Sequence, residues 1–114
     1  MRTRRAADED RREELLRPSR HLGYDRDALA SFLMSREAYR QAEWLYRRAI
    51  WANPFEARFR AHLALCLLKQ GRLEEAREIS AQLDDIADDE IREIVSRVNS
   101  RADIQRPGSE DRDS

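Results

Sequence analysis

The most reactive side chains in this chain belong to two histidines and one cysteine. His21 and His62 stand far apart, and neither has a cysteine or carboxylate at a spacing typical of metal ligands. Cys66 lies between Leu63 and Leu67 in an apolar helical pattern, which favours a small buried thiol over a nucleophile. The three glycines are scattered and form no phosphate-binding loop. The sequence therefore predicts a protein that is not an enzyme and has no metal or cofactor site.

The two tryptophans indicate binding rather than catalysis. In a helix that advances about 100° per residue, Trp44 and Trp51 fall almost opposite Ala42, which belongs to the expected core. Exposed apolar patches mark contact surfaces, and Trp and Arg dominate the energetics of interfaces. We call this stripe the tryptophan surface, and its members are Arg40, Trp44, Arg47, Arg48 and Trp51.

Three arrangements would account for tryptophans on the outer side of a helix. In the first, the N-terminal segment folds back and lays Leu15 and Leu16 on the tryptophan pair. In the second, a partner protein or a second copy of the chain covers them. In the third there is no partner, and arginine side chains stack on the rings through cation–π contacts.

Length and composition restrict the elements that can position these residues. The chain has 114 residues, enough for one small domain, and 39% of them are charged against roughly 25% in average proteins. No apolar run approaches the ~18 residues of a membrane span, and residues 1–20 lack the apolar region of a secretory signal. A single cysteine excludes an internal disulfide. We therefore expect a cytoplasmic protein with no membrane segment.

Apolar residues recur at helical spacing through the middle of the chain, and none alternate as they do in a strand. Asn53, Pro54 and Glu56 form a helix-start signal, with asparagine as N-cap and proline at the first helical position. Asp25 is another good N-cap, and Gly71 suits the left-handed position that ends a helix. The predicted fold class is an all-α, antiparallel stack of about five helices. They are expected over residues 25–35, 37–52, 53–71, 73–83 and 88–101.

Small and apolar residues repeat at a spacing of thirty-four positions, in the pairs Leu29/Leu63, Ala30/Ala64, Leu33/Leu67, Tyr39/Leu73 and Ala42/Ala76. The first unit also carries Ala42, Tyr46, Ala49 and Pro54 in that order, and the second carries Gly-x-Leu-Glu-Glu-Ala from Gly71. These residues resemble the tetratricopeptide repeat family, whose helix pairs bury their apolar faces by stacking.

The resemblance implies a short right-handed solenoid of two repeats and a cap helix. The second repeat departs from the family pattern at Ser80, where an aromatic residue is typical. Two repeats and a cap are fewer than the three or so usually needed for stability, so another segment or chain is expected to contribute. The expected divisions are a polar lead-in, frayed or disordered (1–22), the domain (23–102, with repeats 23–56 and 57–90 and cap 91–101) and a disordered tail (103–114).

Proteins similar to this one bind a peptide or a partner helix in the groove lined by the first helix of each repeat. Carried over to this sequence, the resemblance assigns the groove to Tyr24, Asp27, Ser31, Met34, Ser35, Arg58, Ala61, His62, Leu65, Leu68 and Lys69. Some relatives hold a terminal carboxylate with a lysine and asparagine set. Asp27 and Ser31 occupy its first-repeat positions here, so that ligand is not predicted.

The leading hypothesis is a non-enzymatic protein-interaction module, such as an adaptor, a small chaperone or an assembly factor. Its partner would be a peptide or helix in the groove, with the tryptophan surface as a second contact. One alternative is a structural protein that assembles into homo-oligomers through the ends of the stack. Nucleic-acid binding through the arginines is less favoured, because the net charge is −1 and residues 72–114 are rich in acids.

Overall fold

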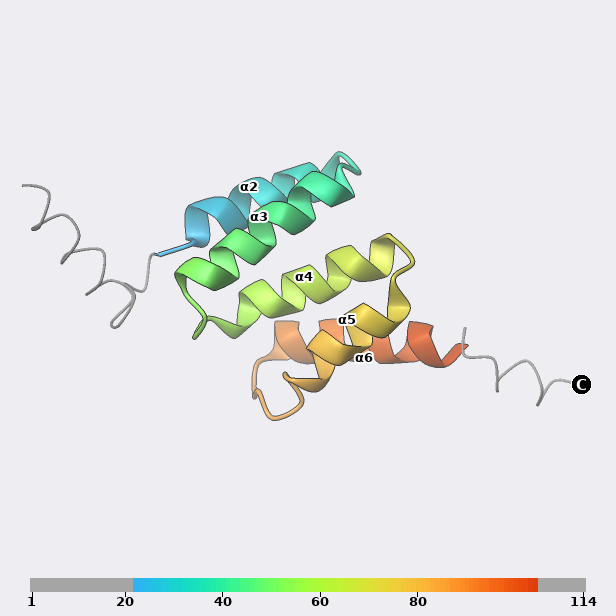
Figure 1. Ribbon diagram of the computed structural model, residues 1–114. Coiled ribbons are helices and arrows are strands. Elements are labelled where there is room, and N and C mark those ends of the chain that lie inside the picture. Colours follow the sequence, from blue (N-terminus) through green and yellow to red (C-terminus); the bar gives the residue numbers. More distant parts are fainter. Residues whose placement is uncertain (1–21, 105–114) are drawn as a thin grey trace, which may run out of the picture.

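The computed structural model describes residues 22–104, so the expectations for the lead-in and for most of the tail lie outside the described residues. Within this range the chain forms five helices and no strand, which confirms the all-α fold class (Figure 1). They are α2 (Tyr24–Ser35), α3 (Tyr39–Ala52), α4 (Ala57–Lys69), α5 (Leu73–Ala81) and α6 (Asp89–Ile104).

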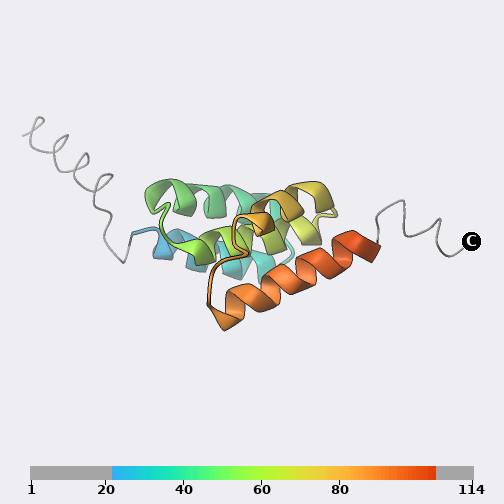
Figure 2. The same ribbon diagram turned by 90° about the horizontal axis from the view of Figure 1, so that it is seen from below.

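The helices form two layers. Each helix packs against the next one along the chain, and α4 also packs against α6. Figure 2 shows α3 and α5 in one layer and α2, α4 and α6 in the other. The first helices of the successive repeats therefore share one face of the stack, and the second helices share the opposite face, as the resemblance implied.

The core depends on small residues at the predicted repeat positions. Ala30, Ala64, Ala42 and Ala76 are all fully buried, which lets the helix backbones approach closely. Larger side chains fill the remaining volume, and those that are almost completely buried include Tyr46, Phe59, Leu63, Leu67, Ile91 and Val98. The thirty-four-residue spacing thus predicted the alanine positions that are used for close packing.

The predicted starts of two helices are wrong by a few residues. Asn53 is not the N-cap of α4 but the C-cap of α3, where its N–H donates to the Ala49 carbonyl at 2.9 Å. Glu56 caps α4 instead, and its carboxylate accepts from the N–H of Arg58 at 3.1 Å. Similarly α2 begins after Gly23 rather than at Asp25. Because Asn53 still continues the hydrogen bonding of α3, the cap of α4 lies three residues later than the motif indicated.

The cap helix begins where its acidic cluster predicted and extends beyond its expected end. Asp88 accepts a hydrogen bond from the N–H of Ile91 at 3.1 Å, and this bond helps to hold the pKa of the Asp88 carboxyl below its usual range. Helix α6 then continues to Ile104, two residues past the expected domain end. Ile91, Ile94 and Val98 are its buried stripe.

Ser80 stands thirty-four residues after the buried Tyr46 and supplies a test of the core. Its hydroxyl is buried and has no hydrogen-bond partner among the described residues. We expect Ser80→Ala to raise the free energy of unfolding by about 1–2 kcal/mol, because it removes an unsatisfied polar group and improves helix propensity. Urea denaturation measures this change. Ser96→Ala on the exposed side of α6 is the control for propensity alone, and equal gains in both variants would contradict the burial argument.

Candidate functional site

His62 joins three helices on the face formed by α2, α4 and α6. Its Nδ1 lies 2.8 Å from the Asp27 carboxylate on α2, and its Nε2 lies 2.9 Å from the Glu90 carboxylate on α6. A carboxylate accepts at each nitrogen, so both nitrogens donate and the imidazolium form is favoured. Burial opposes the charged ring, but the two hydrogen bonds and the two negative charges outweigh it and raise the pKa of His62.

This arrangement predicts a loss of stability at high pH. The folded chain holds the proton of His62 more tightly than the unfolded chain does. Its contribution is therefore fully present below the unfolded pKa of about 6.5 and is lost as pH rises through the higher folded pKa. We expect the unfolding midpoint to fall as pH increases above about 6.5. Thermal unfolding of His62→Gln beside the parent chain measures the difference. Parallel pH profiles in the two chains would exclude this role, since His21 is present in both.

The other predicted groove residues are largely occupied by contacts within the chain. The hydroxyls of Ser31 and Tyr46 are 2.8 Å apart, and burial raises the pKa of Tyr46 to about 12. Tyr24 donates to the Glu56 carboxylate and meets the Phe59 ring edge-on at 5.0 Å.

Of the remaining groove residues, Arg58 pairs with Asp88 at 3.4 Å. Met34 and Leu65 pack against the core, and Ala61 and Leu68 are buried. Their roles in partner binding stay predictions.

Lys69, at the C-terminal end of α4, is an exposed member of the predicted groove. It borders a hollow of about 320 Å³ that Arg97, Ser100 and Arg101 of α6 line from the other side, with Leu68 beside it. Glu93 pairs with Arg97 at 3.4 Å. This hollow is basic, but the same cations also suit the C-terminal ends of their helices.

The tryptophan surface lies in the opposite layer, on the outer side of α3. Trp44 and Trp51 are 61% and 64% exposed, as the helical projection predicted. The guanidinium of Arg48 lies 5.2 Å from the Trp44 ring centre and 5.9 Å from that of Trp51, so one cation stacks against both rings. Because both rings remain mostly exposed, this stacking does not by itself cover the pair.

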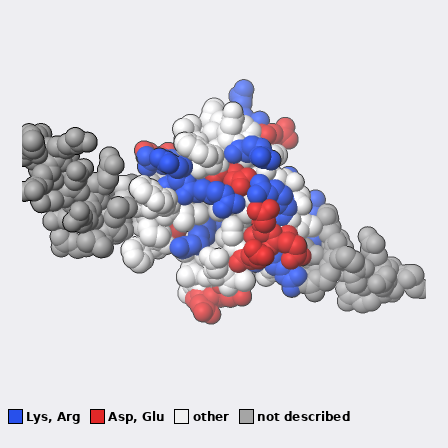
Figure 3. Space-filling model, viewed as in Figure 1, with Lys and Arg blue, Asp and Glu red and all other residues white. Residues whose placement is uncertain are grey.

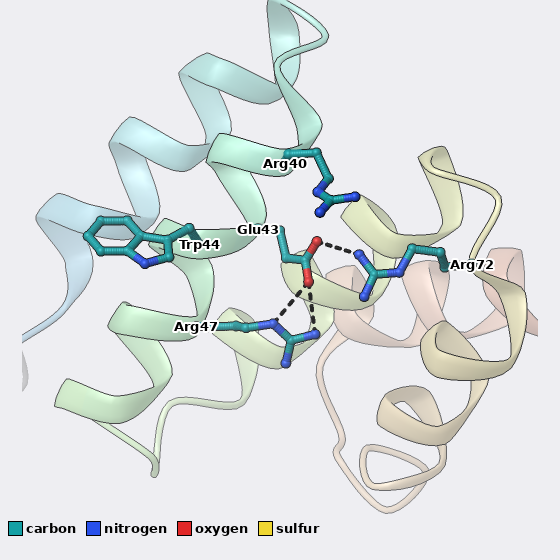
Figure 4. Close-up of a pocket in the computed structure, with 5 residues that line it drawn as sticks. All are labelled: Arg40, Glu43, Trp44, Arg47 and Arg72. Carbon is teal, nitrogen blue, oxygen red and sulfur yellow. Dashed lines mark hydrogen bonds and ion pairs between the residues drawn. The ribbon is translucent and has the colours of Figure 1, made fainter.

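A pocket of about 290 Å³ adjoins this surface, and Trp44 belongs to both (Figure 4). Glu43 lies in its middle and is almost completely buried. Its carboxylate accepts from Arg47 Nε at 3.0 Å and from Arg72 Nη1 at 2.6 Å. We call it the arginine pocket, and its lining residues are Arg40, Glu43, Trp44, Arg47 and Arg72.

The charges in the arginine pocket do not cancel. Burial would raise the pKa of Glu43, but hydrogen bonds from Gln70, Arg72 and Arg47 lower it below its usual range. Arg72 also donates two hydrogen bonds to the Glu75 carboxylate, at 2.9 and 2.7 Å. Arg40 has no ion pair with any residue in the described range 22–104. Figure 3 shows Lys and Arg side chains gathered across the middle of the face that α3 and α5 form.

Three members of this site escaped the sequence analysis. Glu43 could have been found from its i, i+4 spacing to Arg47, a common pairing on helices. Gln70 and Arg72 reach Glu43 from the turn between α4 and α5, which only the packing of the helices brings near α3. Phe55, in the turn before α4, is also 78% exposed and lies outside both surfaces that the sequence predicts.

Of the groups that suggested chemistry, His62 and Cys66 make contacts within the fold, and His21 lies outside the described residues. Cys66 is fully buried, burial raises the pKa of its thiol, and the thiol donates to the Tyr39 carbonyl at 3.2 Å. A thiol with a raised pKa is a poor nucleophile. Across residues 22–104 no three His, Cys, Asp or Glu side chains are grouped so that they could hold a metal ion.

Stacked helix pairs with open side-chain surfaces define a class of repeat proteins that present extended surfaces for binding. The sequence pattern of the tetratricopeptide repeat matches residues 33–97, more than half of the chain, and the chain belongs to this family. Repeats of this family generally mediate protein–protein interaction, and their fold is non-catalytic. No curated protein and no solved structure matches the chain. None of the helices in the described part is long and apolar enough to cross a bilayer.

Proposed function

We propose that this protein is a non-enzymatic interaction module that binds a partner protein through the tryptophan surface. One observation carries the proposal. Trp44 and Trp51 stand a little over 60% exposed on one stripe of α3, in a chain with only two tryptophans. Large exposed aromatic rings are costly to leave in water and supply much of the energy of interfaces. The module acts as an adaptor, a small chaperone or an assembly factor in the cytoplasm.

The tryptophan surface is favoured over the groove as the binding site because the polar side chains of the groove already make hydrogen bonds within the chain. His62, Ser31 and Tyr24 make hydrogen bonds within the chain, so a ligand in the groove has to compete with them. On the outer side of α3, Arg48 is stacked over both rings and holds them ready for contact. A preorganised aromatic surface loses little side-chain entropy on binding.

Peptide display tests this proposal. A library of helical peptides is selected on the full chain, with excess soluble Trp44→Glu/Trp51→Glu variant present as competitor. We expect peptides that bind the parent chain and not the variant, with a shift in tryptophan emission on binding. If every recovered peptide binds both chains equally, the tryptophan surface is not the binding site.

Coverage by the chain's own N-terminal segment is separated by a second measurement. In the full chain, Leu15→Glu/Leu16→Glu removes the apolar residues that would lie on the rings in the fold-back arrangement. We expect tryptophan emission to be unchanged. A red shift in this variant would favour the fold-back arrangement over a partner. A homo-oligomer is distinguished by sedimentation across a range of concentrations, where binding between copies gives a mass that rises with concentration.

A further inference from the structure

We propose that the arginine pocket receives a single carboxylate of the partner, so that the module selects segments with an acidic residue beside an apolar one. This inference rests on the proposed function and names the chemistry of its partner. Arg40 and Arg47 lie two turns apart on α3, about 10 Å along the helix axis, and Trp44 lies between them. In Figure 4 the Trp44 ring projects from the side of α3 away from Glu43 and Arg47, but Trp44 also lines the pocket, so a segment on the rings has the pocket next to it across α3.

Unused hydrogen-bond donors support this occupant. Arg47 donates to Glu43 from Nε, and its Nη2 lies 3.0 Å from the same carboxylate oxygen and 4.0 Å from Glu75, whereas its Nη1 has no partner among the described residues. The guanidinium of Arg40 is likewise without a hydrogen bond in residues 22–104. Guanidinium groups bind carboxylates in a planar, two-point geometry, which is stronger than a bond between neutral groups.

Glu43 holds the pocket in shape and also limits its charge. By pairing with Arg47 and Arg72 it fixes two of the three arginines around the hollow. Glu43 and Glu75 together offset two of the three positive charges and leave an excess of one. One carboxylate matches that excess. A phosphate monoester carries a charge of about −1.5 to −2 and would be repelled by Glu43.

The same charge balance argues against nucleic acid. A phosphate backbone requires a row of uncompensated cations, whereas Arg72 is held by two carboxylates and Arg47 by at least one. The Glu75 and Glu43 carboxylates would repel the phosphate backbone of a nucleic acid. The aromatic rings alone do not discriminate, because bases also stack on tryptophan. The carboxylate is therefore the ligand that the pocket fits.

The test uses the display library on three full-length chains: the parent, Arg40→Gln, and Arg92→Gln on the exposed side of α6 as a matched control. The parent and the control should enrich peptides with Asp or Glu within about one helical turn of an aromatic or aliphatic residue. Arg40→Gln should keep the apolar preference and lose the acidic one. For a single recovered peptide, changing its acid to the amide should weaken binding to the parent by about 3- to 10-fold. The same change should have no effect on Arg40→Gln.

Each other outcome overturns the inference in a distinguishable way. If the three pools contain equal numbers of acids but still depend on Trp44 and Trp51, the carboxylate site is wrong and the proposed function stands. If no pool depends on the tryptophans, the proposed function itself fails. If oligothymidylate quenches tryptophan emission with a steep salt dependence and acidic peptides do not bind, the face is a nucleic-acid surface.

Discussion

Gly23→Ala is expected to destabilise the chain by about 2–4 kcal/mol. Gly23 adopts a left-handed backbone with φ of +87° before α2, a conformation that costs an L-residue about 1 kcal/mol or more. A methyl group built there would lie 2.8 Å from the Phe59 ring and 2.9 Å from the Ala49 carbonyl oxygen. The carbonyl belongs to α3 and cannot swing away as a side chain can, so the two helices have to separate.

Gly71→Ala is the matched control for this prediction. Gly71 has a similar φ of +78°, but a methyl group there meets no atom within 4 Å. Its substitution should therefore cost only the backbone term, about 1 kcal/mol. Urea denaturation measures the free energy of unfolding of both variants. The difference between their losses is the cost of the steric contacts at Gly23. Equal losses would show that Gly23 is needed only for its backbone conformation and that the chain accommodates a methyl group beside Phe59.

A double-substitution cycle sharpens the same test. Phe59→Leu removes the ring atom that the new methyl group approaches most closely. The combined variant should lose less stability than the sum of the two single variants, because residues in contact do not behave additively. Additive losses would assign the Gly23 effect to the Ala49 carbonyl and the backbone alone.

The repeat spacing predicted the helix stack because small residues recur where helices pack closely. It could not predict how many helices flank each repeat. Ala30 and Ala64 are equally buried, and the helix of each packs against the second helix of its own repeat. Leu29 and Leu63 occupy the same repeat position, yet Leu63 is 2% exposed and Leu29 is 51% exposed. Helix α4 lies between α2 and α6, whereas no described helix lies on the far side of α2. Burial of a repeat position thus depends on its place in the stack.

One half of the candidate site follows from residues close together in the sequence, and the other half follows from contacts between distant residues. The outward placement of Trp44 and Trp51 follows from helical geometry alone and was predicted from spacing. The arginine pocket depends on Arg72, which comes from a turn twenty-nine positions after Glu43 and approaches it only when α3 packs against α4. No spacing within a single helix indicates that Arg72 and Glu43 are in contact. The sequence could therefore predict the apolar half of the surface and not its charged half.

The largest expected effect on binding is the response of a selected peptide to Trp44→Glu/Trp51→Glu. Because the outer stripe of α3 does not contribute to the core, the free energy of unfolding should change by no more than about 0.5 kcal/mol. Affinity should fall at least about 100-fold, since each buried tryptophan at an interface is commonly worth 2 kcal/mol or more and a carboxylate would face the partner's apolar side chains. Circular dichroism and calorimetric titration measure the two quantities on the same samples.

Single substitutions and a control on another helix decide whether the loss is specific to the tryptophan surface. Trp44→Ala should weaken binding more than Trp51→Ala does, because Trp44 borders the arginine pocket as well as the stacked Arg48. Phe32→Glu on α2 introduces one negative charge, half of what the tryptophan pair variant adds, at another exposed aromatic residue, 57% exposed, in the other layer of the stack. Its affinity should match that of the parent chain. If Phe32→Glu weakens binding of the peptide as strongly as Trp44→Glu/Trp51→Glu does, the loss of affinity comes from added negative charge and not from the lost rings.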